Sequence, residues 1–396
     1  MKNYDLITPE GTRDFLFKEC VMRENIEKNV SDIFKSHGYN EIITPGLEFL
    51  DVFNSKSRHF PQEELYKLVD RKGRLLVLRP DSTMPIARVV ATRLKEAVLP
   101  LRLCYDQYVY NVSTTMRGRL DQVEQAGIEL IGSSSKTADI EVIEMSCEVL
   151  EKCSHGDFSL EINDIGFFKE LMNKLEVDDE VKEEIRDLIE VKNYPALNDL
   201  LDSLDANREV TKALKMLPRL FGGEEVFEKA ASLFSDEKTD AVLASLKELY
   251  KDIQQLGCTG RITVDLGMVN RTDYYTGVIL KGYIEGIGDP VLAGGRYDKL
   301  ISEYGYDVPA TGFAVDIDAV AKVLLKHEKP SKKSSDAVVY AVKGYEMKAV
   351  LEAKKMREKG LIAEMAVYDD LEKVKAYAKE LKIGKIVIVA DDVTEL

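Results

Sequence analysis

Two strand patterns on either side of a polar loop restrict the fold of this 396-residue chain more than any other feature of its sequence. They cover 101–110 and 120–131, and a strand pattern at 74–79 precedes them, with a helical pattern at 84–99 in between. This mixed order of strands and helices is typical of an α+β fold, in which helices cover a mainly antiparallel sheet. We therefore expect an α+β core.

Between about 165 and 257 the pattern changes to one helix after another. The clearest helix covers 239–257, where Thr239 is expected to cap the start and Gly257 the end. Its apolar residues recur at spacings of 4, 3, 4 and 3: Val242, Leu246, Leu249, Ile253 and Leu256. Strand patterns resume at 261–266 and 277–284. These features predict a helical module inserted into the sheet-bearing core.

A polar stretch at 326–335, which contains Pro330, is the segment most typical of a linker. The residues after it, 336–396, alternate strand and helix patterns and predict a small parallel βαβαβ domain. The chain is thus expected to consist of a core at 1–325, the linker and this C-terminal α/β domain.

The charge balance argues against a nucleic-acid partner. The chain has 55 lysines and arginines against 70 aspartates and glutamates, a net charge of −15, whereas sequence-independent affinity for nucleic acid comes mostly from lysine and arginine. No apolar run approaches the roughly 18 residues needed to span a bilayer, and the first residues lack the apolar core of a signal peptide. We therefore expect a cytoplasmic protein without a membrane partner.

The cysteines and histidines do not form a pattern typical of metal binding. The five cysteines include no Cys-x-x-Cys pair, and the four histidines stand far apart in the sequence. We therefore expect reduced thiols, no structural zinc or other metal, and no cofactor.

One strand pattern carries polar side chains that indicate a binding site. Gln125 and Glu129 share a face of the predicted strand, with Gly127 between them. They could bracket a small polar molecule, Gly127 would let that molecule approach the backbone, and an ammonium or imidazole group would pair with a buried Glu129. The alternative is a structural role, in which Glu129 pairs with a lysine or arginine and Gly127 marks a bulge.

Three further segments carry candidate contacts, each with a structural alternative. Asp81 and Thr83 lie on one side of an extended chain and could accept the donors of an ammonium group, although Asp81 or Ser82 could instead cap the helix that follows. Residues 270–277 place two tyrosines between polar groups, which is typical of an aromatic wall but also of an ordinary half-buried strand. Residues 293–298 are the third such segment, and their structural alternative is a simple glycine turn.

Taken together and in this order, these segments resemble the histidyl-tRNA synthetase family over about residues 5–325. TPEGTRDFL resembles the N-terminal signature of that family, and GYNEIITPGLE resembles the first class II synthetase motif, whose proline lies at the dimer interface. LRPDST is similar to the amino-acid-binding loop, GRLDQVEQAGIELIG to the second motif, VNRTDYYTG and AGGRYD to the histidine-specific segments, and PATGFAVDIDAV to the third motif. The resemblance implies a class II aminoacyl-tRNA synthetase-like core that forms a homodimer.

The resemblance also implies a histidine pocket in which three residues hold the α-ammonium group, two contact the imidazole ring and one lines the wall. Asp81, Thr83 and Gln125 would hold the ammonium group. Glu129 and Tyr275 would contact the ring, and Tyr297 would line the wall. Asp81 is one methylene shorter than the glutamate that is usual in the family.

Three positions that hold arginine in the family differ in this chain. On the register of the motifs they hold Asn111, Asn270 and Ala319. Each missing guanidinium removes a fixed, planar donor to the phosphates of ATP. The resemblance therefore implies that the chain binds histidine without activating it.

A synthetase-like core that keeps the histidine pocket and lacks these arginines resembles the ATP phosphoribosyltransferase regulatory subunits. That resemblance implies a non-catalytic partner of the short-form catalytic subunit in histidine biosynthesis, with histidine as a feedback effector and no bound tRNA. The C-terminal domain resembles a shortened anticodon-binding domain, which would be a relic or a docking surface.

Other functions remain open on the sequence. An active histidyl-tRNA synthetase would have to draw its phosphate-binding charge from Arg117, Arg119 or Arg271, and a synthetase-like amino-acid ligase would meet the same shortage. The segment KIVIVADDVTEL resembles the start of a phosphoribosyl pyrophosphate site, but no phosphate-binding loop follows it, so Asp391 and Asp392 are expected to be solvated.

Overall fold

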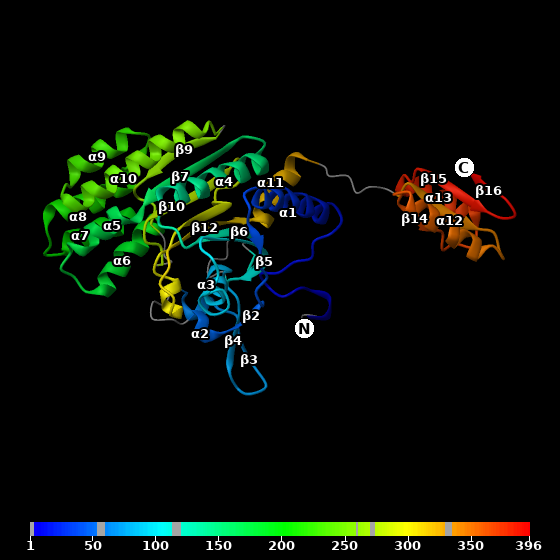
Figure 1. The fold of residues 1–396 in the computed structure, drawn as a ribbon, viewed down its shortest axis with the longest axis horizontal. Helices are drawn as coiled ribbons and strands as arrows, with labels where there is room; N and C mark the ends of the chain where they lie inside the picture. Colours follow the sequence, from blue (N-terminus) through cyan, green and yellow to red (C-terminus); the bar gives the residue numbers. More distant parts are fainter. Residues whose placement is uncertain (1–3, 54–59, 113–119, 259, 270–273, 329–334) are drawn as a thin grey trace. The chain divides into compact units, whose positions relative to one another are not determined.

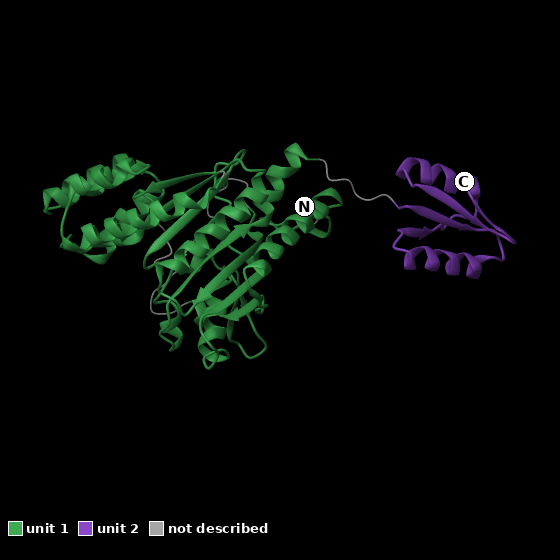
Figure 2. Ribbon diagram, turned by 45° about the horizontal axis from the view of Figure 1, so that its top comes forward, with its two compact units in different colours: residues 1–328 green, residues 329–396 purple. Residues whose placement is uncertain are grey.

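The chain divides into two units, residues 1–328 and 329–396, in the computed structural model (Figure 2). The structure describes residues 4–53, 60–112, 120–258, 260–269, 274–328 and 335–396. Most of the expected linker, residues 329–334, lies outside the described residues, and each unit is described by itself.

The first unit is built on a sheet whose described strands follow the order β1-β5-β6-β12-β11-β10-β7-β9-β8. The strands from β5 to β7 pair antiparallel, whereas β1 pairs parallel to β5 and β9 parallel to β7. Their bounds are β1 Asn40–Glu41, β5 Leu101–Tyr110, β6 Gln122–Ile131, β12 Ala310–Asp316, β11 Leu292–Arg296, β10 Val278–Ile284, β7 Phe158–Asp164, β9 Arg261–Asp265 and β8 Phe221–Gly222. The mainly antiparallel α+β core predicted from the sequence is thus confirmed.

Three long helices, α1 (Lys18–Ser36), α4 (Lys136–Ser154) and α11 (Ile317–His327), pack together against one face of this sheet (Figure 1). The packing against α4 is close, because a Cβ atom at Gly282 on β10 would lie 2.6 Å from a methyl group of Leu150. The opposite face is therefore the one on which a site can open.

A smaller structure precedes the central strands. It contains the three-stranded sheet β2-β4-β3 and two helices: β2 Leu47–Phe49, α2 Leu50–Phe53, β3 Lys67–Val69, β4 Leu75–Leu78 and α3 Thr83–Thr92. The predicted end of this helix at Leu99 is wrong. The backbone N–H groups of Arg93 and Leu94 both donate to Val89 O, and α3 ends there. The start of α3 lies directly after Asp81 and Ser82.

The helical module consists of α5 Ile165–Asn173, α6 Asp179–Glu190, α7 Tyr194–Ser203, α8 Arg208–Met216, α9 Glu225–Leu233 and α10 Glu237–Ile253. The prediction that Thr239 caps α10 is wrong. Asp236 is the N-cap, and its side chain and that of Thr239 exchange hydrogen bonds with each other's backbone N–H groups in a capping box. Gly257 adopts the left-handed conformation expected at the end of the helical stretch, with φ of 69°.

The second unit has the strand order β14-β13-β15-β16, covered by two helices. The elements are β13 Ala337–Ala341, α12 Glu346–Glu358, β14 Ala363–Met365, α13 Leu371–Leu381, β15 Lys385–Val389 and β16 Val393–Glu395. The predicted parallel βαβαβ order is present, and β16 adds an antiparallel strand that the sequence did not predict. Asp391 and Asp392 are exposed in the turn that leads into β16.

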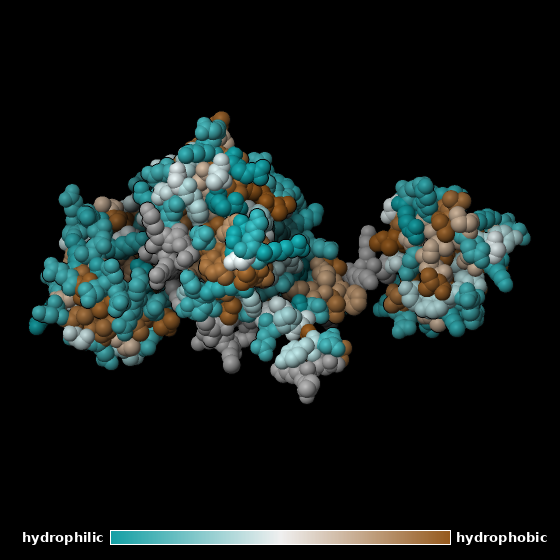
Figure 3. Space-filling view, turned by 90° about the horizontal axis from the view of Figure 1, so that it is seen from below, coloured by the Kyte–Doolittle hydropathy of each residue, from teal (hydrophilic) through white to brown (hydrophobic). Residues whose placement is uncertain are grey.

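On the face shown in Figure 3, hydrophilic side chains cover much of each unit, and smaller hydrophobic patches are scattered among these side chains. Within the described ranges, no helix combines the length and the apolar character needed to cross a membrane.

Candidate functional site

The candidate site lies on the sheet face opposite α1 and α11. Because side chains alternate along a strand, Gln125, Gly127 and Glu129 of β6 share this face. Glu129 pairs with Gly312 on β12, and a Cβ atom at Gly312 would lie only 2.3 Å from Glu129 Oε2. The carboxyl group of Glu129 therefore lies over the bare backbone of the neighbouring strand.

Glu129 is held by two hydroxyl groups and is only 2% exposed. Thr83 Oγ1 donates to Glu129 Oε1 at 2.7 Å, and the Tyr297 hydroxyl donates to Glu129 Oε2. Burial raises the pKa of Glu129 to about 8, the two hydroxyl donors oppose this rise, and the nearby carboxyl of Asp81 adds to it. The structure thus brings Thr83, Tyr297 and Glu129 together, and Thr83 is hydrogen-bonded to the carboxyl group of Glu129.

Asp81 makes the capping contact that was one of its two predicted roles, and its other role stays a prediction. Its Oδ1 accepts a hydrogen bond from Met84 N at 3.2 Å, as a capping side chain would at the start of α3. Its Oδ2 is buried and has no hydrogen-bond partner among the described residues. Burial raises the pKa of Asp81 to about 7, and the bond from Met84 opposes the rise. One carboxyl oxygen is thus left to receive a donor from a ligand.

Tyrosine rings enclose the two carboxyl groups. Tyr274 lies 4.7 Å from Tyr275 and 5.8 Å from Tyr297 between ring centroids, and both partner rings are buried. Tyr275 and Tyr297 thus lie in one cluster of rings beside Glu129, and their predicted contacts with a ligand stay predictions. Tyr274 joins them in that cluster.

Tyr105 on β5 is a residue of the site that the sequence reasoning missed. It lies directly opposite Gly127, and a Cβ atom at Gly127 would come within 2.5 Å of its hydroxyl oxygen. The expectation that Gly127 gives a ligand access to the backbone is therefore wrong, because the Tyr105 ring takes that space. The only available signal was the hairpin register, which the length of the intervening loop does not determine.

Gln125 lies at the other end of the same strand face. It is half-buried and pairs with Gln107 on β5 and with Asp316 on β12. The Gln107 side chain is fixed to Thr44 and Arg79, with its Oε1 accepting from Thr44 Oγ1 at 3.0 Å. Gln125 is thus on the predicted face, two pleats along the strand from Glu129.

The site carries two carboxyl groups without a described countercharge. Within the described part of the chain, neither Asp81 nor Glu129 forms an ion pair, so the alternative of a salt bridge from Glu129 to lysine or arginine is not seen there. A ligand with an ammonium or imidazole group would supply hydrogen-bond donors and positive charge to both.

Two of the three positions at which the motif resemblance implies a missing arginine lie within the described residues. Asn111 Nδ2 donates to Pro80 O at 2.8 Å and ties the end of β5 to the loop before Asp81. Ala319 lies in the first turn of α11, where its N–H donates to Asp316 Oδ1 at 2.8 Å. Asn270 and the candidate cations Arg117, Arg119 and Arg271 lie outside the described residues.

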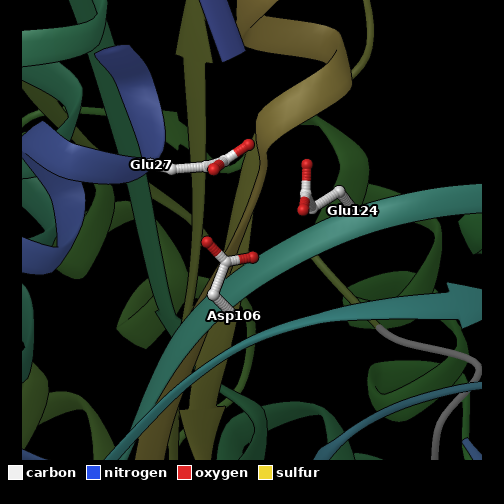
Figure 4. Close-up of side chains that lie close together, drawn as sticks. All are labelled: Glu27, Asp106 and Glu124. Atoms are coloured by element: carbon white, nitrogen blue, oxygen red, sulfur yellow. The ribbon is translucent and has the colours of Figure 1, made fainter. Parts of the chain in front are cut away.

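A second cluster of carboxyl groups lies on the opposite face, beside α1 (Figure 4). Oxygens of Glu27, Asp106 and Glu124 lie within 4.8 Å of one another, a spacing compatible with a metal ion. The buried guanidinium of Arg23 already donates to Glu124 and Asp318, which places a positive charge next to the cluster. Burial and mutual repulsion raise the pKa values of Glu27 and Asp106 to about 7.

Comparisons with known proteins place this geometry in context. Residues 11–320 match the family model of histidyl-tRNA synthetase. An ATP phosphoribosyltransferase regulatory subunit of Clostridium kluyveri is 41% identical over 98% of this chain and 100% of its own length. That of Clostridium acetobutylicum is 40% identical over 98% of this chain and 96% of its own length.

Solved structures give the same picture. A protein of Bacillus halodurans described as an ATP phosphoribosyltransferase regulatory subunit/histidyl-tRNA synthetase superposes with a TM-score of 0.82 at 30% identity, over 95% of this chain and 97% of that one. A histidyl-tRNA synthetase from Nostoc sp. PCC 7120 has a TM-score of 0.77 at 21% identity, over 99% of this chain and 96% of that one, and shows likeness of fold alone.

Proposed function

The chain belongs to the family of ATP phosphoribosyltransferase regulatory subunits, with a core of the histidyl-tRNA synthetase kind, and from this premise we infer that it is the non-catalytic subunit that activates and regulates that enzyme in the first step of histidine biosynthesis. The observation that carries this proposal is 41% identity along essentially the whole length of both chains. The partner is the short-form catalytic subunit, which performs the phosphoribosyl transfer.

Histidine, the end product of the pathway, is the effector, and it binds in the pocket around Glu129. The α-ammonium group pairs with Asp81 and Gln125, the imidazole ring contacts Glu129 and Tyr275, and Tyr297 lines the wall. Support comes from the buried Asp81 Oδ2, which has no described hydrogen-bond partner, and from the orientation of Glu129, which Thr83 and Tyr297 fix from both sides. In this assignment Thr83 acts through the Glu129 carboxyl rather than on the ligand itself.

The bound histidine is not activated. Asn111 and Ala319 carry no charge, and Asn111 is engaged with the backbone of Pro80, so neither side chain can clamp the phosphates of ATP. Loss of a single transition-state donor typically costs about a hundredfold or more in rate. The chain therefore acts through its binding equilibria, as a regulator that favours one state of the complex.

The rest of the proposal concerns assembly and location. The synthetase-like core, residues 1–325, forms a homodimer, and the small C-terminal domain at 336–396 is a shortened anticodon-binding domain that serves as a relic or a docking surface. The net charge of −15 supports the absence of a tRNA partner. The complex works in the cytoplasm, where histidine is made.

The test is to mix the purified chain with the short catalytic subunit of its own organism and to follow phosphoribosyl-ATP formation while titrating histidine. We expect activation by the wild type and by Glu129→Gln, with an inhibition curve shifted at least about tenfold to higher histidine in the variant, because a charge-assisted hydrogen bond is lost. Glu96→Gln makes the same chemical change at an exposed position and should leave the curve in place.

Failure of the chain to activate the catalytic subunit would overturn the regulatory function. An unchanged inhibition curve with Glu129→Gln would overturn the assignment of the pocket. In the same preparation, histidine-dependent exchange of pyrophosphate into ATP should stay at background, and a clear signal would show that the chain activates histidine after all.

A further inference from the structure

The two carboxyl groups of the pocket, those of Asp81 and Glu129, have no positively charged partner among the described residues. Glu129 is 2% exposed, Asp81 Oδ2 is buried, and the Asp81 carboxyl lies close enough to Glu129 to raise its pKa. Two carboxylates that share a poorly solvated site cannot both ionise freely without a nearby cation. In the histidine-free protein at least one of them must therefore hold a proton near neutral pH.

The groups facing Asp81 do not relieve this charge. Those described within electrostatic reach are one carboxyl and four phenols, from β5, β6, the segment before β10 and the turn after β11: Glu129, Tyr105, Tyr274, Tyr275 and Tyr304. A tyrosine hydroxyl can donate one hydrogen bond but brings no positive charge. The single described hydrogen bond to Asp81 is the weak one from Met84 N at 3.2 Å.

Glu129 differs from Asp81 in a way that separates their roles. Both oxygens of Glu129 already accept from protein hydroxyl groups, whereas Asp81 keeps one oxygen without a partner among the residues that the structure describes. An imidazole ring that meets Glu129 can share a proton with it, so that contact need not release one to solvent. An ammonium group brings only donors, so it requires Asp81 to be ionised.

We propose that Asp81 is protonated in a large fraction of the histidine-free protein and that the α-ammonium group of histidine displaces this proton, so that feedback by histidine is coupled to proton release. The O–H bond of the Asp81 carboxyl breaks, the proton passes to the solvent buffer, and the carboxylate pairs with the ammonium group. This inference rests on the proposed function, because it takes histidine as the ligand of the pocket. Its consequence is that histidine inhibits more strongly as pH rises.

The sign and size of the effect follow from the raised pKa of Asp81, which is about 7. At a pH below this pKa the Asp81 carboxyl is mostly protonated, so part of the binding free energy is spent on removing its proton. At a pH above this pKa the carboxylate is already formed. The contribution of Asp81 should make histidine binding about tenfold weaker near pH 6 than near pH 8. Near pH 7 about half a proton should leave per histidine bound, and close to none near pH 8.5.

The experiment is calorimetric titration of the full-length chain with L-histidine near pH 7, in buffers that differ in ionisation enthalpy. Imidazolepropionate, which has the same ring and carboxylate without the ammonium group, serves as the matched ligand, because any proton exchanged by the ring is common to both. We expect histidine to release about half a proton more than imidazolepropionate. Asp81→Asn should bind histidine more weakly and lose this difference, whereas Asp81→Glu keeps a carboxyl and should retain it.

The outcomes separate this inference from the function on which it rests. If histidine binds with the same heat in every buffer, or if Asp81→Asn releases as many protons as the wild type, proton coupling through Asp81 is refuted and the regulatory pocket stands. If histidine does not bind to the chain or to its complex with the catalytic subunit, the proposed effector site falls and this inference falls with it.

Discussion

Gly312 on β12 lies opposite Glu129 on β6, and at the scale of single residues it sets the geometry of the pocket. A Cβ atom there would lie 2.1 Å from Ile128 O and 2.3 Å from Glu129 Oε2. Neither atom can move freely, since one belongs to the backbone of the paired strand and the other is held by Tyr297. The position of the buried carboxyl thus depends on a residue that has no side chain.

We predict that Gly312→Ala lowers stability by about 1–3 kcal/mol, because the added methyl group overpacks the sheet. It should also weaken histidine binding, because the Glu129 carboxyl is displaced. Urea unfolding and calorimetry measure the two effects. Gly288→Ala is the matched control, since a Cβ atom there meets nothing within 4 Å. Wild-type stability and affinity in Gly312→Ala would show that the carboxyl does not lie over this backbone.

The residue scale also shows which parts of the site the sequence could predict. The two-residue period of a strand was sufficient to place Gln125 and Glu129 on one face. The hydrogen bond from Thr83 to Glu129 joins the start of a helix to a residue near the end of a strand, so it depends on how α3 packs on the sheet. No local pattern carries that information, which is why Thr83 was expected to contact the ligand directly.

At the scale of elements, the long central strands were the most predictable. The pattern at 101–110 coincides with β5, and that at 120–131 differs from β6 only at its start. Tertiary contacts decide the shorter elements. The strand β1 is limited to Asn40–Glu41 by its pairing with β5, and β16 forms only because the last residues fold back on β15. A three-residue edge strand after two aspartates has too little periodicity to be recognised.

The start of α10 provides a prediction at this scale. Asp236→Ala should lower the stability of the helical module by about 1–2 kcal/mol, because the capping box with Thr239 is lost. Hydrogen exchange of the amides in the first turn of α10 measures the change. Lys174→Ala removes the ion pair with Asp236 and keeps the cap, so it should cost less. Equal losses in the two variants would mean that the ion pair, and not the cap, holds the helix start.

At the scale of the whole molecule, each unit has hydrophobic clusters of its own among the described residues. All buried residues of the largest cluster, from Met22 to Leu324, belong to the first unit, whereas the two smaller clusters lie between Ala337 and Val389. The alternation of strand and helix patterns was sufficient to predict the order of elements in the second unit. The antiparallel edge strand β16 could not be predicted in this way, because it is only three residues long.

Separate cores predict separate folding. Residues 335–396 should fold when expressed alone, although a domain of about 60 residues is only marginally stable. Circular dichroism of this fragment should show its helices, and calorimetry of the full chain should resolve two transitions. A fragment that stays unfolded at low temperature would show that the second unit needs the first.

The order of strands in the large sheet has a consequence for synthesis on the ribosome. One edge of β6 pairs with β12, which begins at Ala310, roughly 180 residues after β6 ends at Ile131. At about 5–20 residues per second, translation leaves that edge without its partner for on the order of 10–35 seconds. An open strand edge of this length is a template for aggregation. The nascent chain therefore carries an unpaired strand edge until β12 has been made, and we expect chaperones to protect the chain during that period.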